Sequence, residues 1–227
     1  AALHPVVATG NSVNDTAFDG IHLEGTGAGS AATASGNTVS NVTDSGVYVN
    51  NFANVNANGN SVASVDAAGV EIAGIGGGGV TANGNSIDGA AGQGIRISGF
   101  ATAEANANVI NDTGTNGIEL SGIGSGAATA NGNTLTTIGT LTVDNGIYIA
   151  GFAEATANGN SIVGTTGDAI HAEGAGAGNV TASNNTLSTI GQDGIDLDAF
   201  LDVTANANAL SGVGGDGITL VHVRNAT

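Results

Sequence analysis

The heptapeptide Thr81-Ala82-Asn83-Gly84-Asn85-Ser86-Ile87 decides the fold, because the chain repeats it nine times with small changes. Its second asparagine keeps one place in every unit: Asn11, Asn37, Asn60, Asn85, Asn108, Asn133, Asn160, Asn185 and Asn208. Counted from the first residue of the heptapeptide, the units begin at 7, 33, 56, 81, 104, 129, 156, 181 and 204, which is 23 to 27 residues apart. A unit repeated this often indicates stacked copies of one local structure.

The residue pattern within each unit favours strands over helices. The chain contains 40 glycines, and no stretch has apolar residues at the i, i+3, i+4 and i+7 spacing of a helix. Apolar residues instead occupy alternate positions, as in Gly146-Ile147-Tyr148-Ile149, which is the period of a strand with one buried face. We therefore expect an all-β, parallel β-solenoid of about nine coils that spans 1–227 as one domain, with 1–6 as an N-terminal segment.

Three columns of residues are expected to point into the core. The first is Ala8, Ala34, Ala57, Ala82, Ala105, Ala130, Ala157, Ala182 and Ala205; the second is Val13, Val39, Val62, Ile87, Ile110, Leu135, Ile162, Leu187 and Leu210; the third is Ile21, Val47, Val70, Ile95, Ile118, Ile147, Ile170, Ile195 and Ile218. Small residues facing branched ones predict a thin, filled core. An enzyme-sized cavity is not expected.

A resemblance to a known repeat supports this interpretation. The run from Gly84-Asn85-Ser86-Ile87 to Gly94-Ile95-Arg96-Ile97 resembles the parallel β-helix repeat of pectate-lyase-like proteins and secreted bacterial adhesins. The resemblance extends over nearly the whole chain and implies a right-handed coil with an internal ladder of the nine asparagines. Each ladder asparagine would bond both backbone and the next coil's amide. The repeat serves lyases, hydrolases, tailspikes, adhesins and fibrous proteins, so it does not choose a function.

The composition argues against several classes of partner. Two arginines, no lysine and 19 acidic residues give a formal charge of -17, which disfavours nucleic acid and anionic membranes. No run of 18 apolar residues is present, so we expect no membrane insertion. Strong acidity, few aromatic residues and a first residue other than Met predict a secreted protein located outside the cell or on its surface.

One outward column concentrates the functional groups. Its members are His22, Tyr48, Glu71, Arg96, Glu119, Tyr148, His171, Asp196 and Thr219. Tyr48, Glu71, Arg96, Glu119 and Tyr148 form a candidate ligand strip, in which arginine holds a uronate, tyrosines support sugar rings and a carboxylate acts as acid or base.

The interpretation that we favour for this strip is structural, with Arg96 paired across strands to Glu71 and Glu119. The resemblance implies that lyases of this fold use a basic residue near bound calcium, and the chain offers only Arg96 and Arg224. We therefore expect no catalytic residues and no enzyme activity. A polysaccharide-active or glycan-binding protein is the alternative.

Metal binding is not expected, with one alternative. Asp193, Asp196 and Asp198 lie close together in the sequence, beside Asp202, and a calcium site there is weighed against a solvated acidic corner, which we favour. His22 and His171 share a column but lie six coils apart, so they cannot share one metal ion. No other cofactor is implied.

A third functional alternative is ice binding. A regular polar strip carries Thr33, Asn56, Thr81, Glu104, Thr129, Thr156, Thr181 and Thr204 beside a column that is mostly asparagine. Flat threonine arrays on β-solenoids resemble the ice-contacting faces of some antifreeze proteins. Glu104 interrupts the array, and threonine also simply suits a strand.

Phenylalanine recurs in every second unit, at Phe52, Phe100, Phe152 and Phe200, and the alternate units carry glycine-rich excursions. Each ring could fill the room left by glycine neighbours. If the rings instead face solvent, they form a stripe for lateral contact between rods.

The ends of the chain carry the functional prediction. Neither end has an obvious polar cap, so Leu3 and Val6 at one end and Val221 and Val223 at the other are candidate end contacts. We expect the chain to be its own partner in a head-to-tail homopolymer that serves as an extracellular filament, with glycans as further candidate partners. A fragment of a longer solenoid is the alternative explanation.

Overall fold

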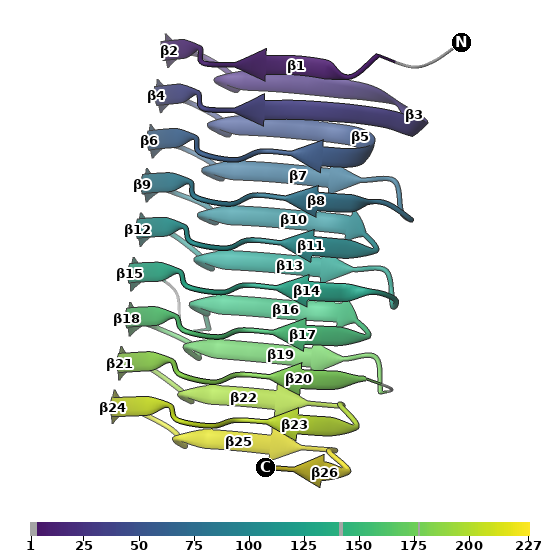
Figure 1. Cartoon of the computed structure of the whole chain (residues 1–227). Coiled ribbons are helices and arrows are strands. Elements are labelled where there is room, and N and C mark those ends of the chain that lie inside the picture. Colours follow the sequence, from purple (N-terminus) through teal and green to yellow (C-terminus); the bar gives the residue numbers. More distant parts are fainter. Residues whose placement is uncertain (1–3, 141–142, 177) are drawn as a thin grey trace.

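The chain is a single stack of parallel strands. The computed structural model describes residues 4–140, 143–176 and 178–227. Figure 1 shows the coils following one another from the N-terminus to the C-terminus, each hydrogen-bonded to the next in parallel register. Over these residues no helix is long and apolar enough to cross a membrane. The predicted all-β solenoid of about nine coils is confirmed.

Each coil crosses three faces in turn. The first face carries β1 (Val6–Thr9), β8 (Gly79–Thr81), β11 (Thr102–Glu104), β14 (Ala127–Thr129), β17 (Glu154–Thr156), β20 (Asn179–Thr181), β23 (Asp202–Thr204) and β26 (Asn225–Ala226). The second carries β2 (Ser12–Thr16), β4 (Thr38–Val42), β6 (Ser61–Val65), β9 (Ser86–Ala90), β12 (Val109–Thr113), β15 (Thr134–Ile138), β18 (Ser161–Thr165), β21 (Thr186–Ile190) and β24 (Ala209–Val213). The third carries β3 (Ile21–Ser35), β5 (Val47–Asn56), β7 (Val70–Gly74), β10 (Ile95–Phe100), β13 (Ile118–Gly122), β16 (Ile147–Phe152), β19 (Ile170–Gly174), β22 (Ile195–Asp198) and β25 (Ile218–Val221).

The strands β3 and β5 continue around a bend onto the first face. Among the described residues, hydrogen bonding therefore joins the first and third faces into one 17-stranded sheet, while the second face is a separate nine-stranded sheet. The nine unit origins pair in one row, from Val7 with Thr33 to Thr181 with Thr204. We number the coils 1 to 9 from these origins.

The corner between the first and second faces requires a left-handed backbone. Gly84 stands there with φ +64°, and a Cβ added to it would meet no atom within 4 Å. The same place holds Ala107 with φ +56° in coil 5 and Asn184 with φ +59° in coil 8. This region costs a residue other than glycine about 1–2 kcal/mol. The stack therefore imposes the corner even where glycine is absent.

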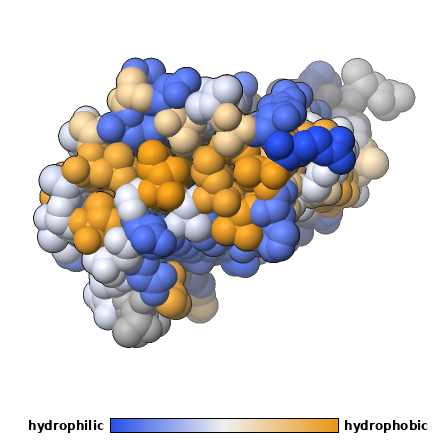
Figure 2. Space-filling model, turned by 90° about the horizontal axis from the view of Figure 1, so that it is seen from below, coloured by the Kyte–Doolittle hydropathy of each residue, from blue (hydrophilic) through white to orange (hydrophobic). Residues whose placement is uncertain are grey.

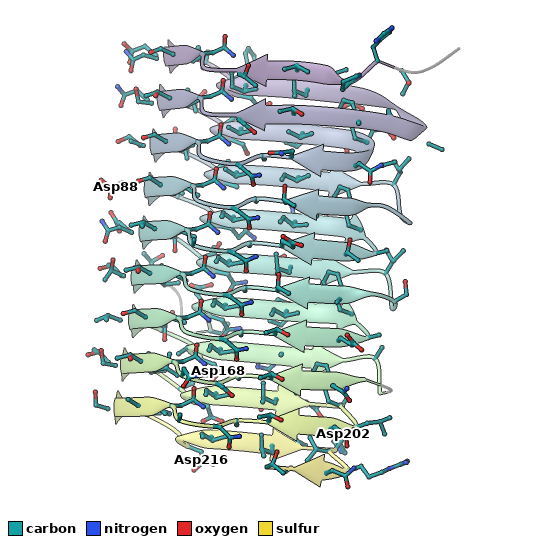
Figure 3. All side chains as sticks on the ribbon, viewed as in Figure 1. Asp88, Asp168, Asp202 and Asp216 are labelled. Carbon is teal, nitrogen blue, oxygen red and sulfur yellow. The ribbon has the colours of Figure 1, made fainter. Side chains whose placement is uncertain are left out.

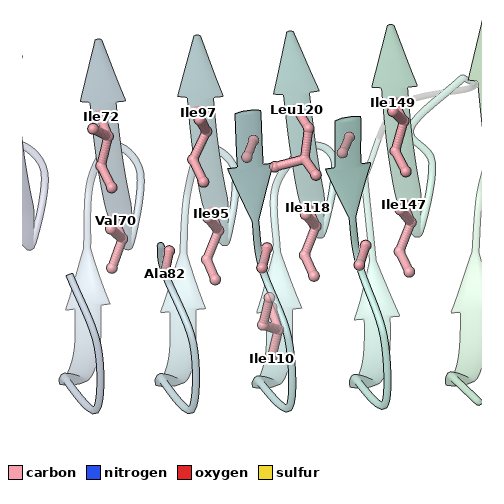
Figure 4. Packing of buried hydrophobic residues seen from close by; sticks show 14 of the residues in the cluster. Val70, Ile72, Ala82, Ile95, Ile97, Ile110, Ile118, Leu120, Ile147 and Ile149 are labelled. Carbon is pink, nitrogen blue, oxygen red and sulfur yellow. The ribbon is translucent and has the colours of Figure 1, made fainter. Parts of the chain in front are cut away.

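The core is built from the three predicted columns. In coils 2 to 8 their members are no more than 2% exposed. Figure 4 shows two parallel rows on the third face, Val70, Ile95, Ile118 and Ile147 in one and Ile72, Ile97, Leu120 and Ile149 in the other. Each buried aliphatic side chain therefore stacks on an aliphatic side chain of the next coil, which keeps the core thin and continuous.

The nine asparagines form an internal ladder with one polarity. The backbone N–H and Nδ2 of Asn85 both donate to Oδ1 of Asn108, at 2.8 and 3.1 Å, and Asn60 donates to Asn85 in the same way. The Nδ2 of Asn60 also donates to the carbonyl of Ala34 in the preceding coil, at 2.8 Å. Eight side-chain links run from the first coil to the ninth. In the inner coils the asparagines are at most 1% exposed, so the ladder satisfies buried polar groups.

The alternative of a solvent-facing phenylalanine stripe for lateral contact is wrong, and the rings pack inward as the favoured interpretation has it. Phe52, Phe100, Phe152 and Phe200 are at most 2% exposed. The excursion glycine of the preceding coil makes room for each ring. A Cβ added at Gly74, for example, would lie 2.6 Å from the ring of Phe100. The alternation of phenylalanine and glycine is therefore core packing across a coil pair.

Candidate functional site

The outward column of the third face exists as the periodicity predicts. Its residues pair one to one through adjacent coils: His22, Tyr48, Glu71, Arg96, Glu119, Tyr148, His171, Asp196 and Thr219. Neighbouring strands in a sheet lie about 4.7–4.9 Å apart, so each inner member of the column lies beside the members one coil above and one coil below. The interactions within the column are therefore between residues of adjacent coils.

Arg96 is held between two carboxylates in the middle of the column. Its Nη1 donates to Oε1 of Glu71 at 3.0 Å, and its Nε lies 3.6 Å from Oε1 of Glu119. Gln93 and Asn116 also donate to Oε2 of Glu119, at 3.0 and 3.1 Å. A uronate would have to displace these partners. The geometry is that of a half-exposed ion-pair network between coils.

The two tyrosines of the ligand strip are in contact with histidines. The ring of Tyr48 lies 5.0 Å from that of His22, and Tyr148 stacks on His171 with centroids 5.5 Å apart. Burial raises the pKa of both tyrosines, with Glu71 adding to the effect at Tyr48 and Glu173 at Tyr148. Both phenols therefore stay protonated at neutral pH.

His171 is surrounded by carboxylates. Its Nδ1 lies 3.0 Å from Oδ2 of Asp168 and 3.1 Å from Oδ2 of Asp196, and its Nε2 lies 3.0 Å from Oε1 of Glu173. The hydrogen bond to Asp168 is the largest cause that raises the pKa of His171 to about 9, against the opposing effect of burial. The imidazole is therefore a cation at neutral pH and is unsuited to act as a general base.

The sequence reasoning missed Asp168. The signal was available, because Asp168-Ala169-Ile170-His171 repeats the spacing of Asp19-Gly20-Ile21-His22, where Asp19 Oδ2 lies 2.8 Å from His22 Nδ1. An aspartate three residues before the column therefore reaches the column histidine in both coils.

The three calcium candidates have different partners. Asp193 accepts hydrogen bonds from the backbone N–H of Asp216 and the hydroxyl of Thr219, and Asp198 lies 2.8 Å from Nδ1 of His222. Figure 3 shows Asp202 apart from Asp168 and Asp216. Within the described ranges, one group of three or more candidate ligands is close enough to share an ion: Asp168, His171 and Asp196. Of the calcium candidates only Asp196 belongs to it.

The asparagine column beside the polar threonine strip forms a second ladder at the corner between the first and second faces, which the sequence reasoning did not foresee. The Oδ1 atoms of Asn58, Asn83 and Asn106 each accept the backbone N–H of the residue at the same place in the next coil, at 2.6 to 2.8 Å. The ladder continues through Asn131 and Asn158 in the same way. Its asparagines therefore hold the outer corner of the coils together.

The family-model comparison agrees with this architecture. A model described as "right handed beta helix region" matches residues 4–162. The chain belongs to this family. No curated protein and no solved structure matches the chain. Because one fold hosts many activities, membership in the β-helix family fixes the architecture and leaves the activity to be argued from the sites.

The core columns are less covered at the end coils of this β-helix than inside it. Ile218 is 42% exposed at the ninth coil, and Ala8 and Val13 at the first coil are only partly buried. Of the end-contact candidates, Val6 is 41% exposed although its partner Ala32 is buried, and Val223 is half-buried. Val221 is 36% exposed, but it pairs with Asp198 on an outward row and is not part of the core. Leu3, the remaining end-contact candidate, lies outside the described residues. Figure 2 looks onto the C-terminal end and shows an apolar band across the coil, flanked by polar residues.

The asparagine ladder of the β-helix is also open at both ends. In the described residues no donor reaches Oδ1 of Asn11, and the backbone N–H of Asn208 has no acceptor, because every inner rung donates toward the next coil. The first coil thus offers an acceptor and the ninth offers donors.

Proposed function

We propose that this β-helix is a noncatalytic structural rod that associates end to end with further copies of itself. The supporting observation is the exposed core at the end coils. Ile218 of the ninth coil is 42% exposed, whereas Ile195, its partner in coil 8, is fully buried. Covering such residues is favourable by about 25 cal/mol per Å² of apolar surface removed from water.

The polarity of the end coils favours a second copy as the occupant. The N–H donors of Asn208 are complementary to the Oδ1 acceptor of Asn11. The strand edges of the two end coils likewise present unpaired backbone N–H and C=O groups that parallel strands of another copy can pair with. A contact between unlike ends is heterologous and does not close, so repeated addition gives an open filament. The core columns would then continue across each junction.

The register of the coil specifies how the copies would meet. Val6 and Ala226 hold equivalent places, because both belong to the row that includes Ala32 and Val203. If Asn11 of an added copy continues the asparagine ladder after Asn208, strand β1 of that copy therefore takes the position of β26. The strand β26 has two residues, and β1 can replace its hydrogen bonds to the first face.

Association can be tested by sedimentation or light scattering over a range of concentrations. We expect the mass of the 227-residue chain to rise with concentration. Ile218→Lys should abolish the rise, because an ammonium group would be buried at the junction. Val109→Lys is the matched control, since Val109 is 52% exposed on the side of the rod.

Deleting residues 225–227 should preserve or strengthen association, because the deletion frees the place that β1 of the next copy takes. A chain that stays monomeric in all these forms rules out the proposal, and equal loss of association in both lysine variants rules out an end-to-end contact.

The absence of catalysis belongs to the same proposal. The support is the engagement of the two outward cations, Arg96 with Glu71 and Glu119, and His171 with carboxylates. We expect no product from uronate polymers. Product release that disappears in Arg96→Gln would show instead that the ligand strip is an active site.

We further propose that the rod works outside the cell, in a matrix, surface or adhesion role. The support is compositional: a formal charge of -17 favours solubility and repels polyanions. Recovery of the protein from the medium or the cell surface is expected, and recovery only from within cells would contradict this location.

A further inference from the structure

Coils 7 and 8 bring three ligand-bearing side chains to one point of the outward column. Asp168 precedes β19, His171 lies on β19, and Asp196 lies on β22; one ligand atom from each lies within 4.8 Å of the others. We propose that this cluster binds one divalent transition-metal ion of the Zn²⁺ type.

The first ligand is oriented by the backbone. Oδ1 of Asp168 accepts the backbone N–H of Asp193 at 2.8 Å, which leaves Oδ2 directed at the imidazole, 3.0 Å from Nδ1. The side chain of Asp168 is only 10% exposed, against 19% for His171 and 21% for Asp196. The ligands are therefore held in place before any ion arrives.

The third ligand has an oxygen without a partner. Oδ1 of Asp196 is buried and accepts no hydrogen bond within the described structure. Carboxylate oxygens of Asp168, Asp196 and Glu173 lie 3.0 to 3.1 Å from the nitrogens of one imidazole. The three carboxylates carry more negative charge than one imidazolium neutralises, which favours a second cation.

The histidine has the second hydrogen bond that metal-bound histidines usually make. Its Nε2 lies 3.0 Å from a carboxylate oxygen of Glu173, so Nδ1 is the nitrogen left to bind the ion. Nδ1 is 3.0 and 3.1 Å from the two aspartate oxygens. Ligands at about 2.0–2.1 Å around tetrahedral Zn²⁺ are roughly 3.3–3.5 Å apart, so little movement is needed.

The donor set distinguishes the ion from calcium. One imidazole nitrogen and two carboxylate oxygens suit Zn²⁺ or Co²⁺, whereas Ca²⁺ takes six to eight oxygens in most proteins. Three protein ligands also leave room for water on the ion.

Coil 1 provides a matched comparison within the same chain. Asp19, His22 and Glu24 repeat the spacing of Asp168, His171 and Glu173, but His22 pairs across coils with Tyr48 where His171 pairs with Asp196. Coil 1 thus has two of the three ligands. Tyr48→Asp should supply the third.

Calorimetric titration with Zn²⁺ in excess Mg²⁺ tests the proposal on the full chain. We expect one ion per chain, retained in His22→Gln and Tyr48→Phe. His171→Gln or Asp196→Asn should weaken binding at least about 100-fold. Tyr48→Asp should bind two ions. Circular dichroism verifies that each variant keeps its strands.

The opposite results would overturn the site. They are no saturable binding by the parent chain, or binding that folded His171→Gln retains. A folded Tyr48→Asp chain that still binds one ion would contradict the assignment of three ligands.

Discussion

Ala107 is a residue whose backbone the stack forces against its preference. It has φ +56° at the corner where Gly84 has φ +64°. Ala107→Gly should therefore stabilise the fold by about 0.5–1 kcal/mol, and Gly84→Ala should destabilise it by about 1 kcal/mol, although open space surrounds Gly84. Urea unfolding of the two variants measures both signs. Two changes of the same sign would show that the corner is not controlled by φ.

The inner ladder makes each asparagine indispensable to its neighbour. Asn108→Ala removes the acceptor of the backbone N–H and Nδ2 of Asn85, both buried. Leaving two buried donors unpaired should cost about 3 kcal/mol or more. Asn111→Ala in the same coil, on the exposed side, is the control and should cost less than about 0.5 kcal/mol. Equal losses of unfolding free energy would contradict a special role for the ladder.

His171 makes stability depend on pH in a defined direction. Its pKa is raised from 6.5 unfolded to about 9 folded, so its contribution is complete below about pH 6.5 and is lost as the pH rises through 9. Up to about 3 kcal/mol should disappear across that window in the presence of a chelator. His171→Gln should lack this fall. Parallel pH profiles for the two proteins would refute the assignment.

Paired phenylalanines and glycines determine how adjacent coils pack at the element scale. Phe100→Ala should cost about 3–5 kcal/mol because it leaves a cavity. Gly74→Ala should also destabilise, since its Cβ would lie 2.6 Å from the Phe100 ring.

A double-mutant cycle on unfolding free energies tests this packing. Gly74→Ala combined with Phe100→Leu should cost less than the sum of the two single changes, because the smaller side chain makes room for the methyl group. Strict additivity would show that the two positions do not compete for space.

The strands could be predicted from the sequence because every coil repeats the same alternation. The inward columns and the outward column of the third face follow from that period and stand where it places them. The direction of the phenylalanines could not be predicted, because the excursions that carry them break the alternation and only the neighbouring glycines decide the outcome. The Asp168 contact was missed because it joins a corner to a strand, outside any single column.

Among the described residues, the strand pairings of the stack join each coil to its neighbours. In a structure of this kind, stability is approximately the sum of terms for each coil and each interface. The end coils therefore have one interface fewer than the inner coils, which matches the exposure of Val6 and Ile218. A further copy at either end would supply the missing interface, and this is the physical basis of the proposed assembly.

Negative-stain electron microscopy of the purified 227-residue chain tests this central claim most directly. Nine coils make a rod of roughly 40 Å, so association should give rods whose lengths are multiples of that value, growing into fibres with concentration, while Ile218→Lys gives single rods. Uniform single rods of the parent chain at every concentration and salt would contradict end-to-end assembly, as would side-by-side bundles that Ile218→Lys leaves unchanged.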